Sequence, residues 1–202
     1  MNWLSSLADP KAVFVADTSV LINLNATGCA AKILGGLACG FAVTENVCAE
    51  LENGRRNGHT DADALKALWR MRLVDRVALG EAGAAVYETL IDGSTLRTLD
   101  DGEAATIGCA VELSGLALID ERKAGNLCAE LFPKLEVVST AELLLSDAVL
   151  HLLGETARAE AISNALLRAR MRVPKTLASR VRAVVGEARA AACRSLPKPR
   201  AV

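Results

Sequence analysis

Residues 12–24 read AVFVADTSVLINL. The run Ala12–Ala16 is short, apolar and partly β-branched, which predicts a buried strand. Asp17 and the two hydroxyl residues that follow it can cap a helix, so we expect a helix to begin before Val20–Leu24. Burying a carboxylate directly after so apolar a strand costs free energy, which indicates a functional role for that carboxylate. Asp17 is therefore the first candidate functional residue.

The same alternation of strand and helix continues to residue 138. Strands are expected at Phe41–Val43, Leu73–Leu79, Leu116–Ile119 and Leu135–Val138. Helices are expected at Ala30–Leu37, Glu45–Glu52, Asp61–Met71, Ala82–Ile91, Gly102–Leu113 and Arg122–Leu131. Strands that alternate with helices imply parallel pairing through crossover connections. The sequence therefore predicts an α/β sandwich with a central parallel sheet.

Only helices are expected after that point. Ser139 and Glu142 match a capping box that opens a helix running to about Leu153. Two further helices are predicted at Glu155–Met171 and Pro174–Ala192. We accordingly divide the chain into an α/β unit, residues 1–140, and a helical extension, residues 141–202.

Charge is unevenly divided along the chain. Residues 1–150 carry 12 Lys and Arg against 21 Asp and Glu, whereas residues 151–202 carry 11 against 3. A basic extension on an acidic body indicates a nucleic-acid or acidic partner. Three roles are open for the extension: packing or dimerisation, binding a nucleic acid by its phosphates, or contacting a protein partner.

Composition excludes several classes of protein. Hydrophobic residues make up 51% of the chain, yet no apolar run approaches the ~18 residues of a membrane span. The six cysteines form no CxxC pair and only two histidines are present, so no zinc-site spacing emerges. The N-terminus lacks the features of a secretory signal. We expect a cytoplasmic protein with reduced thiols and no membrane contact.

Several carboxylates are expected at one edge of the sheet, because ligands of open parallel sheets bind beyond the carboxyl ends of the strands. Acids follow two strands directly, and others lie on or at the start of nearby helices. Clustered carboxylates repel one another unless a cation neutralises them. Oxygen ligands without His or Cys suit Mg²⁺ or Mn²⁺. The alternative for each acid is a helix cap or first-turn residue favoured by the helix dipole.

The order of these acids and of the motifs around them resembles that of a known protein family. VFVADTSVLINL, residues 13–24, looks like the opening motif of PIN domains, and VTENVCAELENG, residues 43–54, looks like their second motif. Residues 99–124, LDDGEAATIGCAVELSGLALIDERKA, resemble a PIN subgroup with a D-x-G-E motif followed by L-I-D-x-R-K-A. The motifs occur in the family's order and cover about residues 12–140.

The resemblance implies a three-layer α/β/α fold and a Mg²⁺- or Mn²⁺-dependent endoribonuclease, in many members the toxin of a toxin–antitoxin pair. Asp17, Glu50, Glu103 and Asp120 would be the catalytic, metal-binding acids, and Ser19 would support them. RNA would be the substrate, an antitoxin a protein partner, and a homodimer the expected assembly. The metal would lower the pKa of a water and stabilise charge on the phosphate.

The fourth motif departs from the commoner toxin pattern. There the acid lies two residues after a Thr at the strand end, whereas Asp120 stands at the strand end itself. Glu121 could share or take its role. Neighbouring acids also compete for the second and third positions: Glu45 and Glu52 with Glu50, and Asp100 and Asp101 with Glu103.

Four basic residues are candidates to contact RNA: Arg55 and Arg56 in the Asn53–His59 loop, and Arg122 and Lys123 beside Asp120. Two rival functions remain. The first is a non-catalytic PIN-like module that binds RNA or a partner. The second is a phosphatase with Asp17 as nucleophile, which would prefer a second Asp where Ser19 stands.

Overall fold

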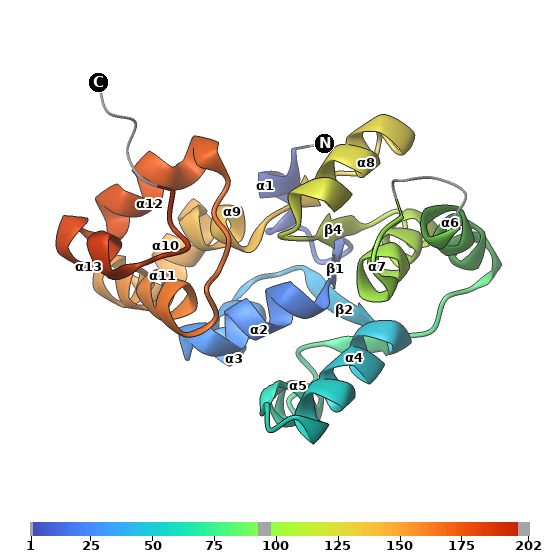
Figure 1. Ribbon diagram of the computed structural model, residues 1–202, viewed down its shortest axis with the longest axis horizontal. Helices are drawn as coiled ribbons and strands as arrows, with labels where there is room; N and C mark the ends of the chain where they lie inside the picture. Colours follow the sequence, from blue (N-terminus) through green and yellow to red (C-terminus); the bar gives the residue numbers. More distant parts are fainter. Residues whose placement is uncertain (1, 93–97, 198–202) are drawn as a thin grey trace.

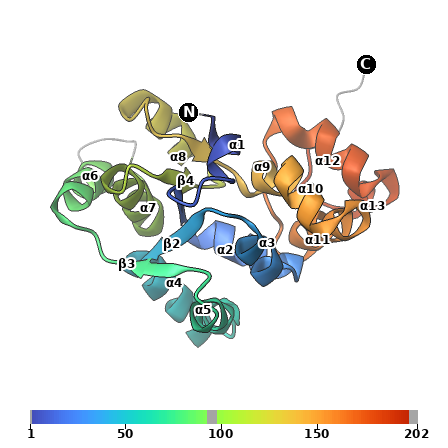
Figure 2. The same ribbon diagram turned by 180° about the vertical axis from the view of Figure 1, so that it is seen from behind.

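A five-stranded parallel sheet forms the centre of the computed structural model, which describes residues 2–92 and 98–197 (Figures 1 and 2). The strand order is β3-β2-β1-β4-β5, and each neighbouring pair is parallel. The strands are β1 (Val13–Ala16), β2 (Gly40–Thr44), β3 (Asp75–Val77), β4 (Leu116–Leu118) and β5 (Val137–Val138). The predicted α/β class and parallel sheet are confirmed.

Helices connect the strands and then continue beyond the last of them. Those before β5 are α1 (Trp3–Ser6), α2 (Thr18–Thr27), α3 (Ala30–Gly36), α4 (Glu45–Arg56), α5 (Asp61–Arg70), α6 (Glu81–Ile91), α7 (Asp101–Glu112) and α8 (Arg122–Leu131). After β5 come α9 (Thr140–Leu145), α10 (Asp147–Leu153), α11 (Glu155–Arg168), the 3₁₀ turn η1 (Lys175–Leu177), α12 (Ala178–Val185) and α13 (Glu187–Ala192). No helix in the described parts of the chain is long and apolar enough to cross a membrane.

Both faces of the central strands β1, β2 and β4 are buried, which accounts for their near-continuous apolar sequences, whereas the edge strand β3 is polar and largely exposed. Alternate side chains of β1 enter different clusters. Phe14 and Ala16 pack in a cluster closed by α2 to α5 and by the helices after residue 140. Val15 packs with Ala117 in a second cluster closed by α6, α7 and α8. Two helical layers on one sheet make the three-layer sandwich.

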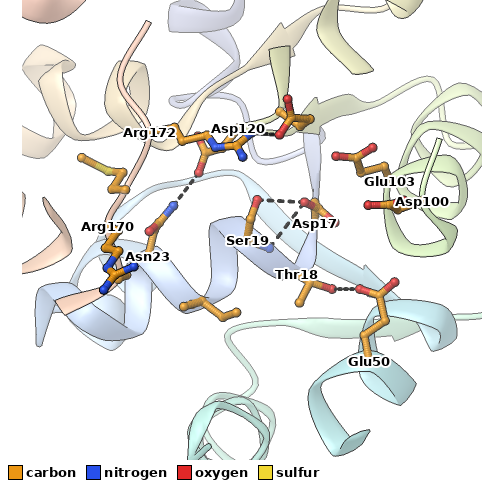
Figure 3. A pocket seen from close by; sticks show the side chains of 14 residues that line it. Asp17, Thr18, Ser19, Asn23, Glu50, Asp100, Glu103, Asp120, Arg170 and Arg172 are labelled. Atoms are coloured by element: carbon orange, nitrogen blue, oxygen red, sulfur yellow. Dashed lines mark hydrogen bonds and ion pairs between the residues drawn. The ribbon is translucent and has the colours of Figure 1, made fainter. Parts of the chain in front are cut away.

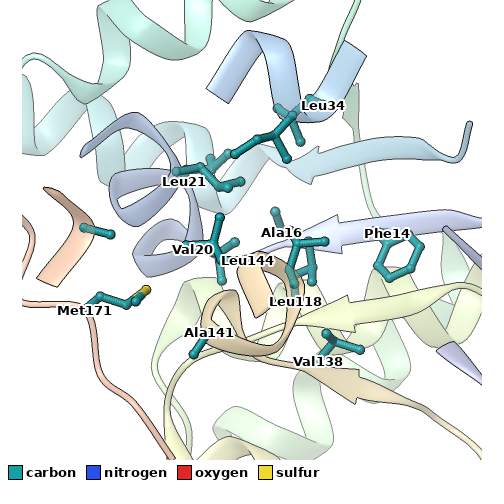
Figure 4. Close-up of a cluster of buried hydrophobic side chains, with 14 of the residues drawn as sticks. Phe14, Ala16, Val20, Leu21, Leu34, Leu118, Val138, Ala141, Leu144 and Met171 are labelled. Carbon is teal, nitrogen blue, oxygen red and sulfur yellow. The ribbon is translucent and has the colours of Figure 1, made fainter. Parts of the chain in front are cut away.

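The helices after residue 140 share the first of these clusters. Figure 4 shows Ala141, Leu144 and Met171 gathered with Phe14 and other residues of the sheet and α2. Side chains of α11, α12 and α13 belong to the same cluster, and α11 packs on α2. The division of the chain at residue 140 stays a prediction.

Two predicted helices are interrupted, and in this the predictions were wrong. The helix opened by the capping box of Ser139 and Glu142 is confirmed at its start. It stops at Ser146, whose backbone is extended and whose hydroxyl accepts from Val149 N–H at 3.3 Å to begin α10. The predicted helix Pro174–Ala192 begins as η1 and breaks at Gly186, which has φ 83°.

Other boundaries moved. Helix α4 runs to Arg56, past the stop predicted at Asn53-Gly54. Arg55 pairs with Glu52 one turn earlier at 3.6 Å, and basic residues favour the last turn of a helix. Helix α11 ends at Arg168, before the predicted Met171, because Arg170 adopts a left-handed backbone with φ 54°.

Candidate active site

The carboxyl ends of β1 and β4 meet at one edge of the sheet. Ala16 pairs with Leu118 in parallel register, and Asp17 N–H donates to the carbonyl of Leu118 at 3.1 Å. Asp17, directly after β1, and Asp120, two residues after β4, are therefore held at the same edge. The pairing of β1 with β4 therefore confirms that both acids lie at the same edge of the sheet.

A cavity of about 540 Å³ opens at this edge (Figure 3). All four predicted catalytic acids line it: Asp17, Glu50, Glu103 and Asp120. The two predicted supporting residues, Ser19 and Glu121, line it as well. The structure thus brings together side chains from four separate segments of the chain.

Asp17 is the N-cap of α2 and is only 4% exposed. Its Oδ2 accepts from the Ser19 hydroxyl at 2.8 Å and from Ser19 N–H at 3.4 Å. Burial raises the pKa of Asp17; the bonds from Ser19 and Thr18 oppose that rise, and the charge of Glu50 adds to it. Ser19 thereby orients the carboxylate and favours its ionised form.

Glu50 reaches the cavity from α4 and is fixed at both oxygens. Oε1 accepts from Gly102 N–H at 2.8 Å, and Oε2 accepts from the Thr18 hydroxyl. A Cβ on residue 102 would lie 2.6 Å from Oε2, so any residue larger than glycine would force this carboxylate to shift. This close approach is a steric reason for the glycine in the D-x-G-E motif.

Glu103 lies on the first turn of α7 and is half-buried. Burial, followed by the charges of Asp17 and Asp100, raises its pKa to about 7. Lys123 acts in the opposite direction. A carboxyl of this kind is poised to lose its proton when a cation is placed beside it.

Asp120 is tied into the protein by three donors. Its Oδ1 accepts from Thr140 N–H at 2.7 Å, and its Oδ2 accepts from the Thr140 hydroxyl and from Asn23 Nδ2, each at 2.6 Å. Burial raises the pKa of Asp120, and these bonds oppose that rise. Asp120 therefore joins β4, α2 and the start of α9 in addition to lining the cavity.

The competing acids are engaged elsewhere. Glu45 pairs with Arg76 at 2.9 Å, and Glu52 pairs with Lys66. Asp101 accepts from the Tyr87 hydroxyl and, at 3.0 Å, from Asn46. These three acids are not among the residues that line the cavity, whereas Asp100 is.

The candidate RNA contacts are scattered. Arg55 pairs with Glu52 and Asp63 on the surface of α4 and α5. Lys123 donates to the carbonyl of Thr98. Neither these two nor Arg56 lines the carboxylate cavity; Arg122 lines a second cavity that adjoins it.

No compact set of metal ligands is assembled: within residues 2–92 and 98–197, no three His, Cys, Asp or Glu side chains are placed to hold one ion. The donors nevertheless fit Mg²⁺, which keeps several waters and is commonly bound through one or two carboxylates. Besides burial, the charge of Glu50 raises the pKa of Asp17, and the charges of Asp17 and Asp100 raise the pKa of Glu103; a cation would relieve this repulsion. The carboxylates suit a largely hydrated divalent ion.

Four polar or charged cavity residues were not singled out for the site from the sequence: Thr18, Asn23, Arg170 and Arg172. The sequence does contain a sign of the role of Asn23, because it is the one polar residue in the apolar run VLINL. Asn23 is only 4% exposed, and a buried amide needs a hydrogen-bond partner. No local signal marks the two arginines, which follow α11 and reach the cavity only through the packing of the extension.

The comparisons with known proteins agree with this architecture. A family model described as a PIN domain matches residues 13–187, which is most of the chain. Comparison with curated proteins and with solved structures gave no match. The family match extends well beyond the motifs, through α12. With its parallel sheet and its family match, the chain belongs to the PIN-domain family.

Proposed function

We propose that the chain is a Mg²⁺- or Mn²⁺-dependent endoribonuclease that hydrolyses RNA phosphodiester bonds. PIN domains are generally nucleases. The observation that carries the proposal is the single cavity into which Asp17, Glu50, Glu103 and Asp120 all converge. Carboxylates so placed beyond parallel strands suit a cation and a phosphate better than an organic ligand.

Asp17 and Glu103 would hold the cation at the acidic end of the cavity, and Glu50 and Asp120 would border it. Bound Mg²⁺ would lower the pKa of a water molecule and offset charge on the phosphate. Ser19 holds the Asp17 carboxylate in place, and Gly102 with Thr18 holds that of Glu50. In-line attack by water would form a new P–O bond as the bond to the leaving oxygen breaks; one RNA end would keep the phosphate, and the other would take up a proton to become a hydroxyl.

The test is cleavage of a labelled mixed RNA pool that includes tRNA. Wild type and Asp17→Asn would be compared with Mg²⁺, Mn²⁺ and EDTA. Discrete products that require metal and disappear in the variant support the proposal. A folded wild type that binds RNA but yields no products with either metal would favour the rival reading, a non-catalytic module.

The biological setting is part of the same proposal. We propose a cytoplasmic toxin that an antitoxin protein restrains and that works as a homodimer. Co-purification of a small partner encoded beside this chain, and release of ribonuclease activity when it is stripped away, would support that setting. Light scattering of the isolated chain measures the oligomeric state.

A further inference from the structure

Residues 169–176 connect α11 to α12 and pass along the rim of the carboxylate cavity; we call them the strap. Its first four residues, Ala169 to Arg172, line the cavity together with the carboxylates. Two of them are arginines on either side of Met171. The strap therefore brings the basic extension to an acidic site that lies far away in the sequence.

The strap is anchored so that the arginines face outward. Met171 is only 1% exposed, belongs to the cluster of Val20 and Ala141 (Figure 4), and its N–H donates to the carbonyl of Ala165 at 3.1 Å. With Met171 held in the core, both flanking side chains are exposed. Arg170 adopts φ 54° to make this turn.

The cavity is consequently polarised. Figure 3 shows Glu50, Asp100 and Glu103 on one side of Asp17; on the other side Arg172 lies beside Asp120 and Arg170 lies beyond Asn23. A nucleic-acid strand at a metal site needs this pattern: a cation-binding end at the reacting phosphate, and fixed positive charge at a neighbouring one.

Arg172 is paired with Glu121, but the pair is accessible, since the two side chains are 67% and 35% exposed. Exposed ion pairs are weak, and a phosphate binds Arg in the same two-pronged geometry as a carboxylate. A phosphate can therefore replace Glu121 as the partner of Arg172 at little cost.

A second cavity, of about 810 Å³, continues from the first, and the two share Asp120, Glu121 and Arg172. Its walls include Val137 at the sheet edge and Val173 with Pro174 in the strap. This volume lies within the ~300–1,000 Å³ of ligand-sized sites.

Arg122 and Lys175 also line the second cavity. In the described part of the chain neither of these two side chains has a hydrogen-bond or ion-pair partner. The apolar walls suit unstacked RNA bases, and these two basic side chains suit the phosphates that join those bases.

Resting on the proposed function, we propose that Arg170 and Arg172 bind backbone phosphates of single-stranded RNA next to the scissile one, and that the strand continues past Lys175 into the second cavity. A base-paired helix would not enter, because its bases are stacked inside and only unstacked nucleotides can occupy such pockets.

The test measures binding separately from cleavage. A labelled single-stranded RNA of about 12 nucleotides is titrated by fluorescence anisotropy in EDTA at several salt concentrations. The proteins are wild type, Arg170→Gln, Arg172→Gln and the double variant. Arg180→Gln is the matched control, because Arg180 is exposed on α12 and lines neither cavity.

Each strap variant is expected to weaken binding and to reduce the slope of log K against log salt by about 0.7, the value for one phosphate contact on a single strand. The double variant should lose roughly tenfold in affinity at moderate salt, while Arg180→Gln matches wild type. An equal affinity and slope in all five proteins would overturn the proposal. So would equal competition by a fully paired duplex.

Cleavage assays with Mg²⁺ then separate this inference from the function on which it rests. If wild type cleaves RNA and the double variant binds and cleaves equally well, the strap proposal fails and the nuclease stands. If wild type never cleaves but binding depends on the strap, the nuclease fails and the strap proposal stands. Faster cleavage by the double variant would overturn it in favour of a strap that shields the carboxylates, such as one meant for an acidic protein partner.

Discussion

Gly102 N–H donates to Glu50 Oε1 at 2.8 Å, and a Cβ at residue 102 would lie 2.6 Å from Oε2 of the same carboxylate. Two segments 52 residues apart are thus fitted together without room for one methyl group. The role of Gly102 here is to position the Glu50 carboxylate, not to form a turn. The contact explains why a glycine precedes Glu103 at the start of α7.

Gly102→Ala is expected to lower metal-dependent RNA cleavage by about 10- to 100-fold, the usual effect of disturbing a residue that supports a metal ligand. The methyl group must displace the Glu50 carboxylate from its present position. Gly54→Ala on α4 is the matched control, since its Cβ would meet only His59, at an ordinary 3.8 Å. Equal activity of the two variants would show that the position of Glu50 does not matter.

Glu103 gives the site a pH dependence. Its folded-state pKa is raised to about 7, by burial first and then by Asp17 and Asp100. The protonated form is therefore favoured by folding, and this contribution to stability is complete below the ordinary value of 4.5 and is lost as the pH rises through about 7.

In EDTA, the Tm should consequently fall between about pH 5.5 and pH 8, and Glu103→Gln should reduce that fall. Mg²⁺ should raise the Tm more at the higher pH, where the carboxylates are ionised. Differential scanning fluorimetry of both proteins, with and without Mg²⁺, measures this. A Tm of wild type that rises with pH in EDTA would contradict the assignment.

Asp120 should matter for stability, since it accepts from Asn23 once and from Thr140 twice. Asp120→Ala leaves these donors without an acceptor, so we expect a loss of about 2 kcal/mol or more in the free energy of unfolding. Glu121→Ala, which removes an exposed ion pair, should cost less than about 1 kcal/mol. Urea denaturation of the two variants compares them, and equal losses would contradict the structural role of Asp120.

The backbone conformation of Arg170 is energetically unfavourable. A side chain at φ 54° is disfavoured, and glycine is the usual residue where a helix ends in this conformation. Arg170→Gly should raise the free energy of unfolding by up to about 1 kcal/mol while weakening RNA binding. A variant less stable than wild type would indicate that the arginine side chain itself supports the strap.

Much of the sheet and its edge could be predicted from local pattern. Apolar strands, cap residues and the order of the acids placed Asp17 and Asp120 correctly at the carboxyl ends of β1 and β4. Helix phase could not distinguish Glu50 from Glu45 and Glu52. The resemblance to the second motif favoured Glu50, and the tertiary contacts agree with it, because both competitors are drawn into ion pairs with Arg76 and Lys66.

The rest depended on long-range packing. Asn23 meets Asp120 across 97 residues, and Arg170 reaches the cavity because Met171 is buried in a core built largely by earlier segments. The helix interruptions at Ser146 and Gly186 were missed because their flanking sequences are good helix formers. The extension looked like a basic appendage, and its packing on α2 makes it a wall of the cavity.

Cleavage of a mixed RNA pool by wild type and Asp17→Asn, with Mg²⁺ or EDTA, tests the central claim most directly. Asn can still accept from Ser19 at the start of α2 and removes a buried charge, so the variant should fold at least as stably as wild type without metal. The account predicts discrete metal-dependent products from wild type and a loss of ~100-fold or more in the variant. Equal cleavage by the two folded proteins, or cleavage that persists in EDTA, would contradict it.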